Sequence, residues 1–207
     1  VSDATYIIKQ LGYDDKQLDK YLNALQNANS EDEIKSIYKT LQKYVKENKF
    51  SRIERGIYLS PDKVPDSLYV LQLKNTEMIY SHGTALYLHE LIDKQPMQIE
   101  VTVKRGYNAT HLRNKGVKTY CTKREQFENG VTIVRTSKGN PVKVYNEDKT
   151  VCDIIRRKSG MACRDFQKIM KKYVSGENKD IGRLLEYAKI EHIEEKAKDY
   201  IGLMTDL

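Results

Sequence analysis

The sequence predicts an α+β protein with an N-terminal winged helix-turn-helix, followed by a mixed α/β domain that ends in a helical part. Helical periodicity fills the first fifty residues, and a short strand-like segment follows at 52–59. Alternating apolar and polar residues, separated by turn signals, then occupy the middle of the chain. Helical periodicity returns near residue 148. The turn-rich stretch 60–66 holds two of the four prolines, so we place the boundary between domains 1–66 and 67–207 there.

The N-terminal domain is predicted to contain helices at 3–11, 15–27 and 31–48. Ser30, with Glu33 three residues later, forms a capping box before the third helix. One arc of this third helix is apolar, with Ile34, Ile37, Tyr38, Leu41, Tyr44 and Val45. The opposite arc carries Lys35, Lys39, Lys43 and Lys46, the face that the last helix of a winged helix would turn to DNA.

The second domain is predicted to begin with helices at 67–74 and 81–93, the latter capped by Ser81 and ended by Pro96. Strands are expected at 97–104, 117–122, 131–136 and 141–146. Helices are then expected at 148–158, 161–174, 180–190 and 192–203.

The net charge of +7 is concentrated in the middle of the chain. Residues 1–75 hold 12 Lys and Arg against 11 Asp and Glu, whereas residues 76–174 hold 19 against 10. Residues 175–207 hold 5 against 8. The segment 104–124 has no acidic residue and contains Lys104, Arg105, Arg113, Lys115, Lys118, Lys123 and Arg124. Such a one-sign segment favours contact with the phosphates of a nucleic acid over a merely solvated face.

The composition argues against several other classes of protein. The apolar runs are too short for a transmembrane helix, and the N-terminus has no secretory pattern. Three cysteines (Cys121, Cys152 and Cys163) without C-x-x-C spacing argue against a disulfide framework or a zinc ribbon. Cys152 and Cys163 are expected to be small core residues. We therefore expect a protein of the reducing cytoplasm with no membrane partner.

No catalytic constellation stands out. His82 and His89 lie seven residues apart, which would permit a shared metal, but their apolar surroundings favour hydrogen-bonded, partly buried imidazoles. His111, among basic residues, is a candidate phosphate contact. Asp153 is expected to make a buried structural hydrogen bond. Glu100 and Lys104 have the wrong strand parity for a compact nuclease motif, and no phosphate-binding glycine loop is present. We expect no cofactor, no metal and no enzymatic activity.

Three segments resemble one known family. The first reads S-H-x-x-A-L-x-L-H-x-L from Ser81 and is followed by Pro96 and I-x-V-T-V from Ile99. The second is R-G-I-Y from Arg55, and the third runs from Val144 to Arg157 with Tyr145, Thr150 and Asp153. In this order and spacing they resemble the AbiEi family, the antitoxins of type IV toxin–antitoxin and abortive-infection systems. Gly83 and Thr84 depart from the Glu-Ser pair more usual there.

The resemblance implies an antitoxin whose N-terminal winged helix represses its own operon by binding inverted repeats in the promoter. It also implies a second domain that counteracts a cognate nucleotidyltransferase toxin, without a stable toxin–antitoxin complex. On this interpretation the signature residues of the antitoxin domain are His82, Leu86, His89, Tyr145, Thr150 and Asp153. Two alternatives are an enzyme that reverses the toxin's modification of a nucleic acid and a plain DNA-binding regulator.

DNA contacts are expected on both domains. In the N-terminal domain the phosphate contacts are Lys35, Lys39, Lys43, Lys46, Arg52 and Arg55, and the groups near base edges are Ser36, Thr40 and Gln42. In the second domain the contacts are Lys104, Arg105, Arg113 and Lys115.

Overall fold

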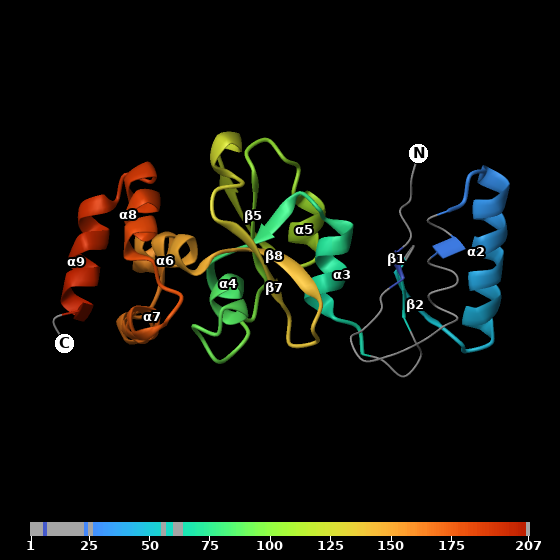
Figure 1. Ribbon diagram of the computed structural model, residues 1–207, viewed down its shortest axis with the longest axis horizontal. Coiled ribbons are helices and arrows are strands. Elements are labelled where there is room, and N and C mark those ends of the chain that lie inside the picture. The colour runs from blue at the N-terminus through green and yellow to red at the C-terminus, as the bar shows by residue number, and fades with distance from the viewer. Residues whose placement is uncertain (1–5, 8–22, 25–26, 55–56, 60–63, 206–207) are drawn as a thin grey trace. The chain divides into compact units, whose positions relative to one another are not determined.

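A computed structural model describes residues 6–7, 23–24, 27–54, 57–59 and 64–205 (Figure 1). The chain is α+β, as the sequence predicts, and its contacts divide it into two compact units. Unit 1 comprises residues 1–74 and 136–140, and unit 2 comprises residues 75–135 and 141–207. The division falls after Lys74, whereas the sequence placed it at 66/67.

The principal helix of unit 1 is α2, Glu31–Lys46, which matches the expected third helix. The Ser30 side chain accepts a hydrogen bond from the Glu33 N–H, and the Glu33 carboxylate accepts one from the Asn29 N–H. The expected capping box is therefore present, with its return bond shifted by one residue. Leu41 is fully buried against Phe50 and Tyr58, with Ile37, Tyr44 and Val45 packed around them. Ile34, expected on the apolar arc, is exposed.

A small sheet completes the described part of unit 1, with strand order β1-β3-β2. Strands β2, Ser51–Glu54, and β3, Ile57–Leu59, pair antiparallel, and β1, Tyr6–Ile7, pairs parallel with β3. The expected helix at 3–11 is therefore wrong at Tyr6–Ile7, where pairing with β3 determines the backbone. Within the expected helix at 15–27, Asn23, Ala24 and Asn27 are described; Asn23 and Ala24 are helical, and Asn27 lies in a turn. The remaining residues of these two ranges lie outside the described part.

Helix α3, Ser67–Lys74, confirms the expected range and packs Val70 against Ile57 and Leu59 of β3. This apolar contact explains why α3 belongs to unit 1. Just before it, Asp66 is buried and accepts hydrogen bonds from the Thr136 hydroxyl and, at 2.9 Å, from the Asn140 side-chain amide.

Unit 2 is built on a mixed five-stranded sheet of order β6-β5-β4-β8-β7. The strands are β4 (Met78–Tyr80), β5 (Glu100–Lys104), β6 (Lys118–Thr122), β7 (Val131–Arg135) and β8 (Pro141–Tyr145). Strand β4 pairs antiparallel with β5 and parallel with β8, while β5 and β6 are parallel. The parallel step from β5 to β6 contains the short helix α5, Thr110–Asn114, and the 3-10 turn η1, Arg124–Gln126, follows β6.

The central strand β4 and the adjoining helix differ from the sequence prediction. Strand β4 is only three residues long, which is too short for an alternating pattern, and no strand was expected there. Helix α4, His82–Leu88, ends eight residues before Pro96, because the Leu91 N–H turns back to the Leu86 carbonyl while Glu90 adopts a left-handed φ of 59°. The expected helix at 81–93 was therefore too long.

The last four helices form the helical part of unit 2. They are α6 (Glu147–Arg156), α7 (Cys163–Ser175), α8 (Ile181–Ile190) and α9 (Glu194–Thr205), with a 3-10 turn, η2 (Lys158–Gly160), after α6. Figure 1 shows these orange to red helices gathered on one side of the unit 2 sheet, with α4 between them and the sheet. Their core joins Leu86 and Leu91 to Val151, Phe166 and Leu184. The expected C-terminal helical part is confirmed.

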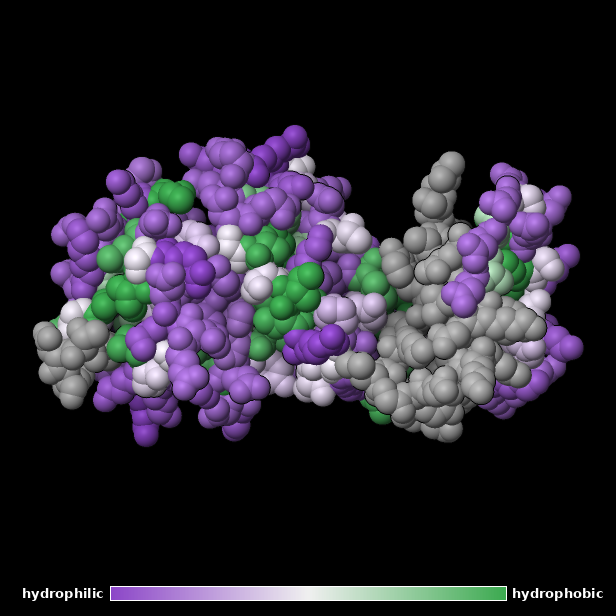
Figure 2. Space-filling view, viewed as in Figure 1, coloured by the Kyte–Doolittle hydropathy of each residue, from purple (hydrophilic) through white to green (hydrophobic). Residues whose placement is uncertain are grey.

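The surface of the described residues is mainly polar. Figure 2 shows hydrophilic side chains covering most of the visible face, with smaller apolar patches between them. Met97 and Ile133 are among the large apolar residues that remain exposed. Within the described part of the chain, no helix has the length and apolar character required to cross a membrane.

Candidate nucleic-acid interface

The basic segment 104–124 runs from the end of β5, through α5 and β6, to η1. Arg105, Arg113, Lys115 and Arg124 are all exposed. No described carboxylate lies within ion-pairing distance of the three arginines. The guanidinium of Arg113 makes only long contacts, 3.3 Å to the Thr110 hydroxyl and 3.5 Å to that of Thr119. The exposed guanidinium groups of the three arginines are therefore accessible to phosphate oxygens.

Lys104 does not fit the expectation of an unpaired phosphate contact. Its Nζ lies 3.1 Å from a Glu77 carboxylate oxygen, 4.0 Å from one of Glu128, and 4.9 Å from the centre of the Phe127 ring. Two carboxylates from outside the basic segment therefore neutralise it. His111, the other suggested phosphate contact, places Nε2 2.7 Å from the Asn75 side-chain oxygen.

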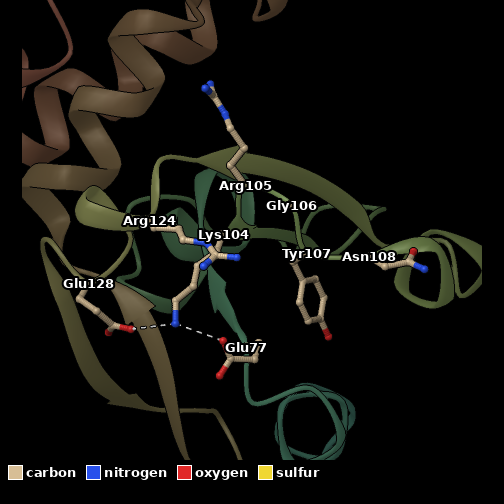
Figure 3. A pocket seen from close by; sticks show the side chains of 8 residues that line it. All are labelled: Glu77, Lys104, Arg105, Gly106, Tyr107, Asn108, Arg124 and Glu128. Atoms are coloured by element: carbon tan, nitrogen blue, oxygen red, sulfur yellow. Dashed lines mark hydrogen bonds and ion pairs between the residues drawn. The ribbon is translucent and has the colours of Figure 1, made fainter.

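A cavity of about 550 Å³ opens beside Lys104 (Figure 3). It is lined by Glu77, Lys104, Arg105, Gly106, Tyr107, Asn108, Arg124 and Glu128. Figure 3 shows Tyr107 and Glu77 extending to the same side of the β5–α5 loop, and Arg105 extending to the opposite side. Tyr107 is not among the residues predicted from the sequence, although the run Gly106-Tyr107-Asn108 between cations combines a turn residue, an aromatic ring and an amide.

The lysine face of α2 is exposed as expected. Lys35 lies 3.8 Å from Glu31 and 3.5 Å from Asp32, and Lys43 lies 3.8 Å from Glu47, all in exposed pairs that water screens strongly. Among the described residues, Lys39 and Lys46 have no such partner.

The polar groups expected to read bases on unit 1 have mixed placements. Ser36 and Gln42 are exposed, whereas the Thr40 hydroxyl donates to the Ser36 carbonyl at 3.1 Å. Arg52 on β2 is exposed, and Arg55 lies outside the described residues.

Four of the signature residues meet where α4, β8 and α6 pack together. The Tyr145 carbonyl accepts hydrogen bonds from His89 Nε2 at 2.7 Å and from the Thr150 hydroxyl at 3.1 Å. Leu86 lies in the apolar core beside them. The Tyr145 hydroxyl, in turn, donates to the Phe127 carbonyl at 2.9 Å. These contacts assign His89, Tyr145 and Thr150 to holding the helical part against the sheet.

Asp153 belongs to a buried ionic network on the same helix. Its carboxylate lies 2.7 Å from Lys149 Nζ and 3.4 Å from Arg156, and Glu191 contacts both of these cations. Burial lowers the pKa of Lys149, but the charges of Asp153 and Glu191 outweigh burial and raise it above its ordinary value. The expected structural role of Asp153 is confirmed. Glu191, at the end of α8, closes this network.

His82 has an unusual environment. It is 3 % exposed, has a left-handed φ of 49°, and stacks on Tyr120 with ring centres 3.6 Å apart. The Arg157 guanidinium also lies over the Tyr120 ring, at 4.4 Å. Nδ1 of His82 lies 3.0 Å from the Ser81 hydroxyl, which accepts a hydrogen bond from the Thr102 hydroxyl. Ser81 therefore occupies the N-cap position of α4 without making the expected cap bond, because its hydroxyl serves His82 and Thr102.

The protonation of His82 should make unit 2 sensitive to acid. Burial lowers the pKa of His82 to about 3, whereas an unfolded histidine titrates near 6.5. The folded state therefore binds fewer protons, so stability is complete above about pH 6.5 and falls as the pH drops toward 3. Between pH 6.5 and 5 we expect a loss of about 2 kcal/mol from this group.

Urea unfolding followed by circular dichroism at the two pH values measures this loss. His82→Asn is the informative variant, because asparagine tolerates a positive φ and does not titrate. It should remove most of the difference, and His192→Asn, at an exposed left-handed position, is the control. Equal acid sensitivity of His82→Asn and wild type would contradict the assignment.

The departures from the family pattern at Gly83 and Thr84 are matched by contacts to Glu100. The Gly83 N–H donates to the Glu100 carboxylate at 2.5 Å, and the Thr84 hydroxyl accepts from the Glu100 N–H at 2.8 Å. A Cβ added at Gly83 would lie 2.7 Å from that carboxylate, so a larger residue here would displace the Glu100 side chain.

The described residues give no support to a metal-centred site. They contain no group of three or more His, Cys, Asp or Glu side chains placed to hold a metal ion. The three cysteines are unpaired, and Cys152 is buried as expected, but Cys163 is exposed at the start of α7 and is not a core residue.

Comparison with known proteins shows a similarity of fold. No protein-family model matches the sequence, and no curated protein matches it. A crystal structure of the RV2827C protein from Mycobacterium tuberculosis superposes with a TM-score of 0.53, covering 89% of this chain and 73% of that chain. The identity is 9%, so the similarity concerns the fold alone. It extends over both units of the present chain and supports the α+β architecture.

Proposed function

We propose that this protein is a cytoplasmic DNA-binding antitoxin of the AbiEi type. It represses its own operon at inverted repeats in the promoter and counteracts a cognate nucleotidyltransferase toxin, without acting as an enzyme itself. The observation that carries the DNA-binding part is the group of exposed arginines in segment 104–124 that have no described carboxylate partner, together with the exposed lysines of α2. The antitoxin part rests on the three sequence segments that resemble the family.

In this proposal two surfaces contact DNA. The lysines of α2, with Arg52 on β2, bind the promoter, while Arg105, Arg113 and Lys115 of unit 2 bind the DNA backbone beside it. The signature residues of α4, β8 and α6 make internal contacts, so they maintain the shape of unit 2 and do not touch a partner directly.

A paired assay of repression and rescue tests the proposal. The full chain is expressed beside a reporter driven by its own promoter, and separately beside the nucleotidyltransferase expected in the neighbouring reading frame. Lys39→Ala with Lys43→Ala should weaken operator binding about tenfold and relieve repression, because two phosphate contacts are lost. Rescue from the toxin should persist in the same variant, because antitoxicity resides in unit 2.

The matched control is Lys168→Ala with Lys171→Ala, two exposed lysines of α7. It should leave repression and rescue unchanged. Unaltered repression in the α2 variant would show that another surface reads the operator, and absence of rescue by the wild-type chain would exclude the antitoxin role.

A further inference from the structure

We infer that the cavity beside Tyr107 binds a single unpaired nucleotide, so that unit 2 recognises single-stranded nucleic acid in addition to duplex DNA. The inference goes beyond the proposed function, in which unit 2 meets only the phosphate backbone of a duplex. It depends on the shape of the cavity, on the exposed surface of an aromatic ring, and on the pairing of charges along the wall.

The surface beside Tyr107 is concave. A duplex backbone meets convex or grooved basic surfaces, whereas the cavity here has a volume of about 550 Å³, within the range of pockets for small organic ligands. Gly106, with a left-handed φ of 89°, turns the chain sharply between β5 and Tyr107. No atom lies within 4 Å of a Cβ added to Gly106, so the loop leaves space at this wall.

The aromatic ring of Tyr107 lines this cavity. Tyr107 is half-buried, and the ring closest to it, that of His111, meets it at 69° with centres 6.0 Å apart. This edge-to-face contact fixes the orientation of Tyr107 without stacking on it. An unpaired base can stack on such a ring, which is the usual way in which proteins hold single-stranded nucleic acids.

Charged side chains of both signs line the cavity. Glu77 and Glu128 face the cavity on either side of Lys104 and would repel the phosphates of a duplex. They suit the edge of a base, because exocyclic amino groups are hydrogen-bond donors that carboxylates accept. The Asn108 side-chain oxygen is already bonded to the Thr110 N–H, which leaves its amide hydrogens to donate to base acceptors. Arg124, exposed and without a described carboxylate partner, is placed to bind the nucleotide phosphate.

Fluorescence anisotropy with the full chain tests this inference. The probes are fluorescein-labelled eight-nucleotide single strands of mixed sequence, as DNA and as RNA, and a blunt sixteen-base-pair duplex without operator sequence. Tyr107→Ala should weaken single-strand binding about 5- to 100-fold through the lost stacking, while Tyr107→Phe keeps near wild-type affinity. Arg124→Glu should weaken single-strand binding without disturbing the packing of Tyr107.

The controls separate this cavity from the duplex surface. Lys171→Glu carries the same change of charge as Arg124→Glu on an exposed position of α7, and it should leave single-strand affinity unchanged. Duplex binding should be insensitive to Tyr107→Ala. The inference is overturned if Tyr107→Ala and Arg124→Glu both bind the single strands like the wild type. It is also overturned if Tyr107→Ala weakens duplex and single-strand binding equally. Failure of operator repression with intact single-strand binding would overturn only the proposed function.

Discussion

Asp148→Ala should lower the unfolding free energy of the helical part of unit 2 by about 2–4 kcal/mol. The Asp148 carboxylate is fully buried at the start of α6 and accepts bonds from the Tyr173 hydroxyl at 2.7 Å and the Asp180 N–H at 2.9 Å. Arg183 contributes a further charged bond from Nε at 2.6 Å. One carboxylate thus ties α6 to α7 and to the start of α8. Its removal leaves the buried Tyr173 hydroxyl without this partner.

Urea unfolding by circular dichroism, combined with hydrogen exchange of peptides from α7 and α8, measures the effect. Exchange is needed because the two units need not unfold as one cooperative system. Asp199→Ala, at an exposed position of α9, is the matched control and should stay within about 0.5 kcal/mol of wild type. Comparable exchange protection of α7 and α8 in the Asp148 and Asp199 variants would show that the carboxylate contributes nothing to stability.

Charge reversal of Arg105, Arg113 and Lys115 to Glu should abolish most of the contribution of unit 2 to duplex binding. If each residue meets one phosphate, the slope of the logarithm of affinity against the logarithm of salt concentration should fall by about three units. Affinity near physiological salt should drop by about 100-fold or more, since each lost contact is replaced by repulsion.

A salt series of anisotropy titrations on promoter DNA measures both quantities. Reversal of Arg164, Lys168 and Lys171 on α7 changes the net charge by the same amount on another exposed surface, so it separates local contact from the overall charge. Similar losses in both triple variants would mean that net charge alone controls binding. If the variant of Arg105, Arg113 and Lys115 has the salt dependence of the wild type, segment 104–124 does not contact the DNA.

Local signals explain which parts of the fold the sequence could predict. Helix α2 has a cap at Ser30 and an apolar arc along its sixteen residues, and the predicted range of α3 matches the structure residue for residue. Strand β4 was missed because three apolar residues carry no period, although they form the centre of the sheet. Helix α4 was extended too far because the left-handed Glu90 has no distinctive residue type.

In the candidate site, too, some features could be predicted from the sequence and others could not. Exposed cations could be recognised from composition alone, so Arg105, Arg113 and Lys115 were named in advance. The pairing of Lys104 with Glu77 and Glu128 could not, because those carboxylates lie 27 and 24 positions away along the chain. The contacts of Asp148 with Tyr173 and Arg183 could not be predicted either, because these residues lie 25 and 35 positions away along the chain. Long-range pairing of charge is decided by topology, which residue patterns do not specify.

The buried carboxylate of Asp66 has a consequence for how this gene can be divided or recombined. Its partners, Thr136 and Asn140, lie some seventy positions later, at the tip of the β7–β8 hairpin, and both are buried. A truncated chain that begins at residue 67 would keep the hairpin but leave two buried polar side chains without their acceptor, which costs stability. A chain that stops at residue 74 would keep Asp66 and lose both donors. Replacement of the N-terminal part alone therefore has to supply a new acceptor for these two side chains, or replace the hairpin tip as well.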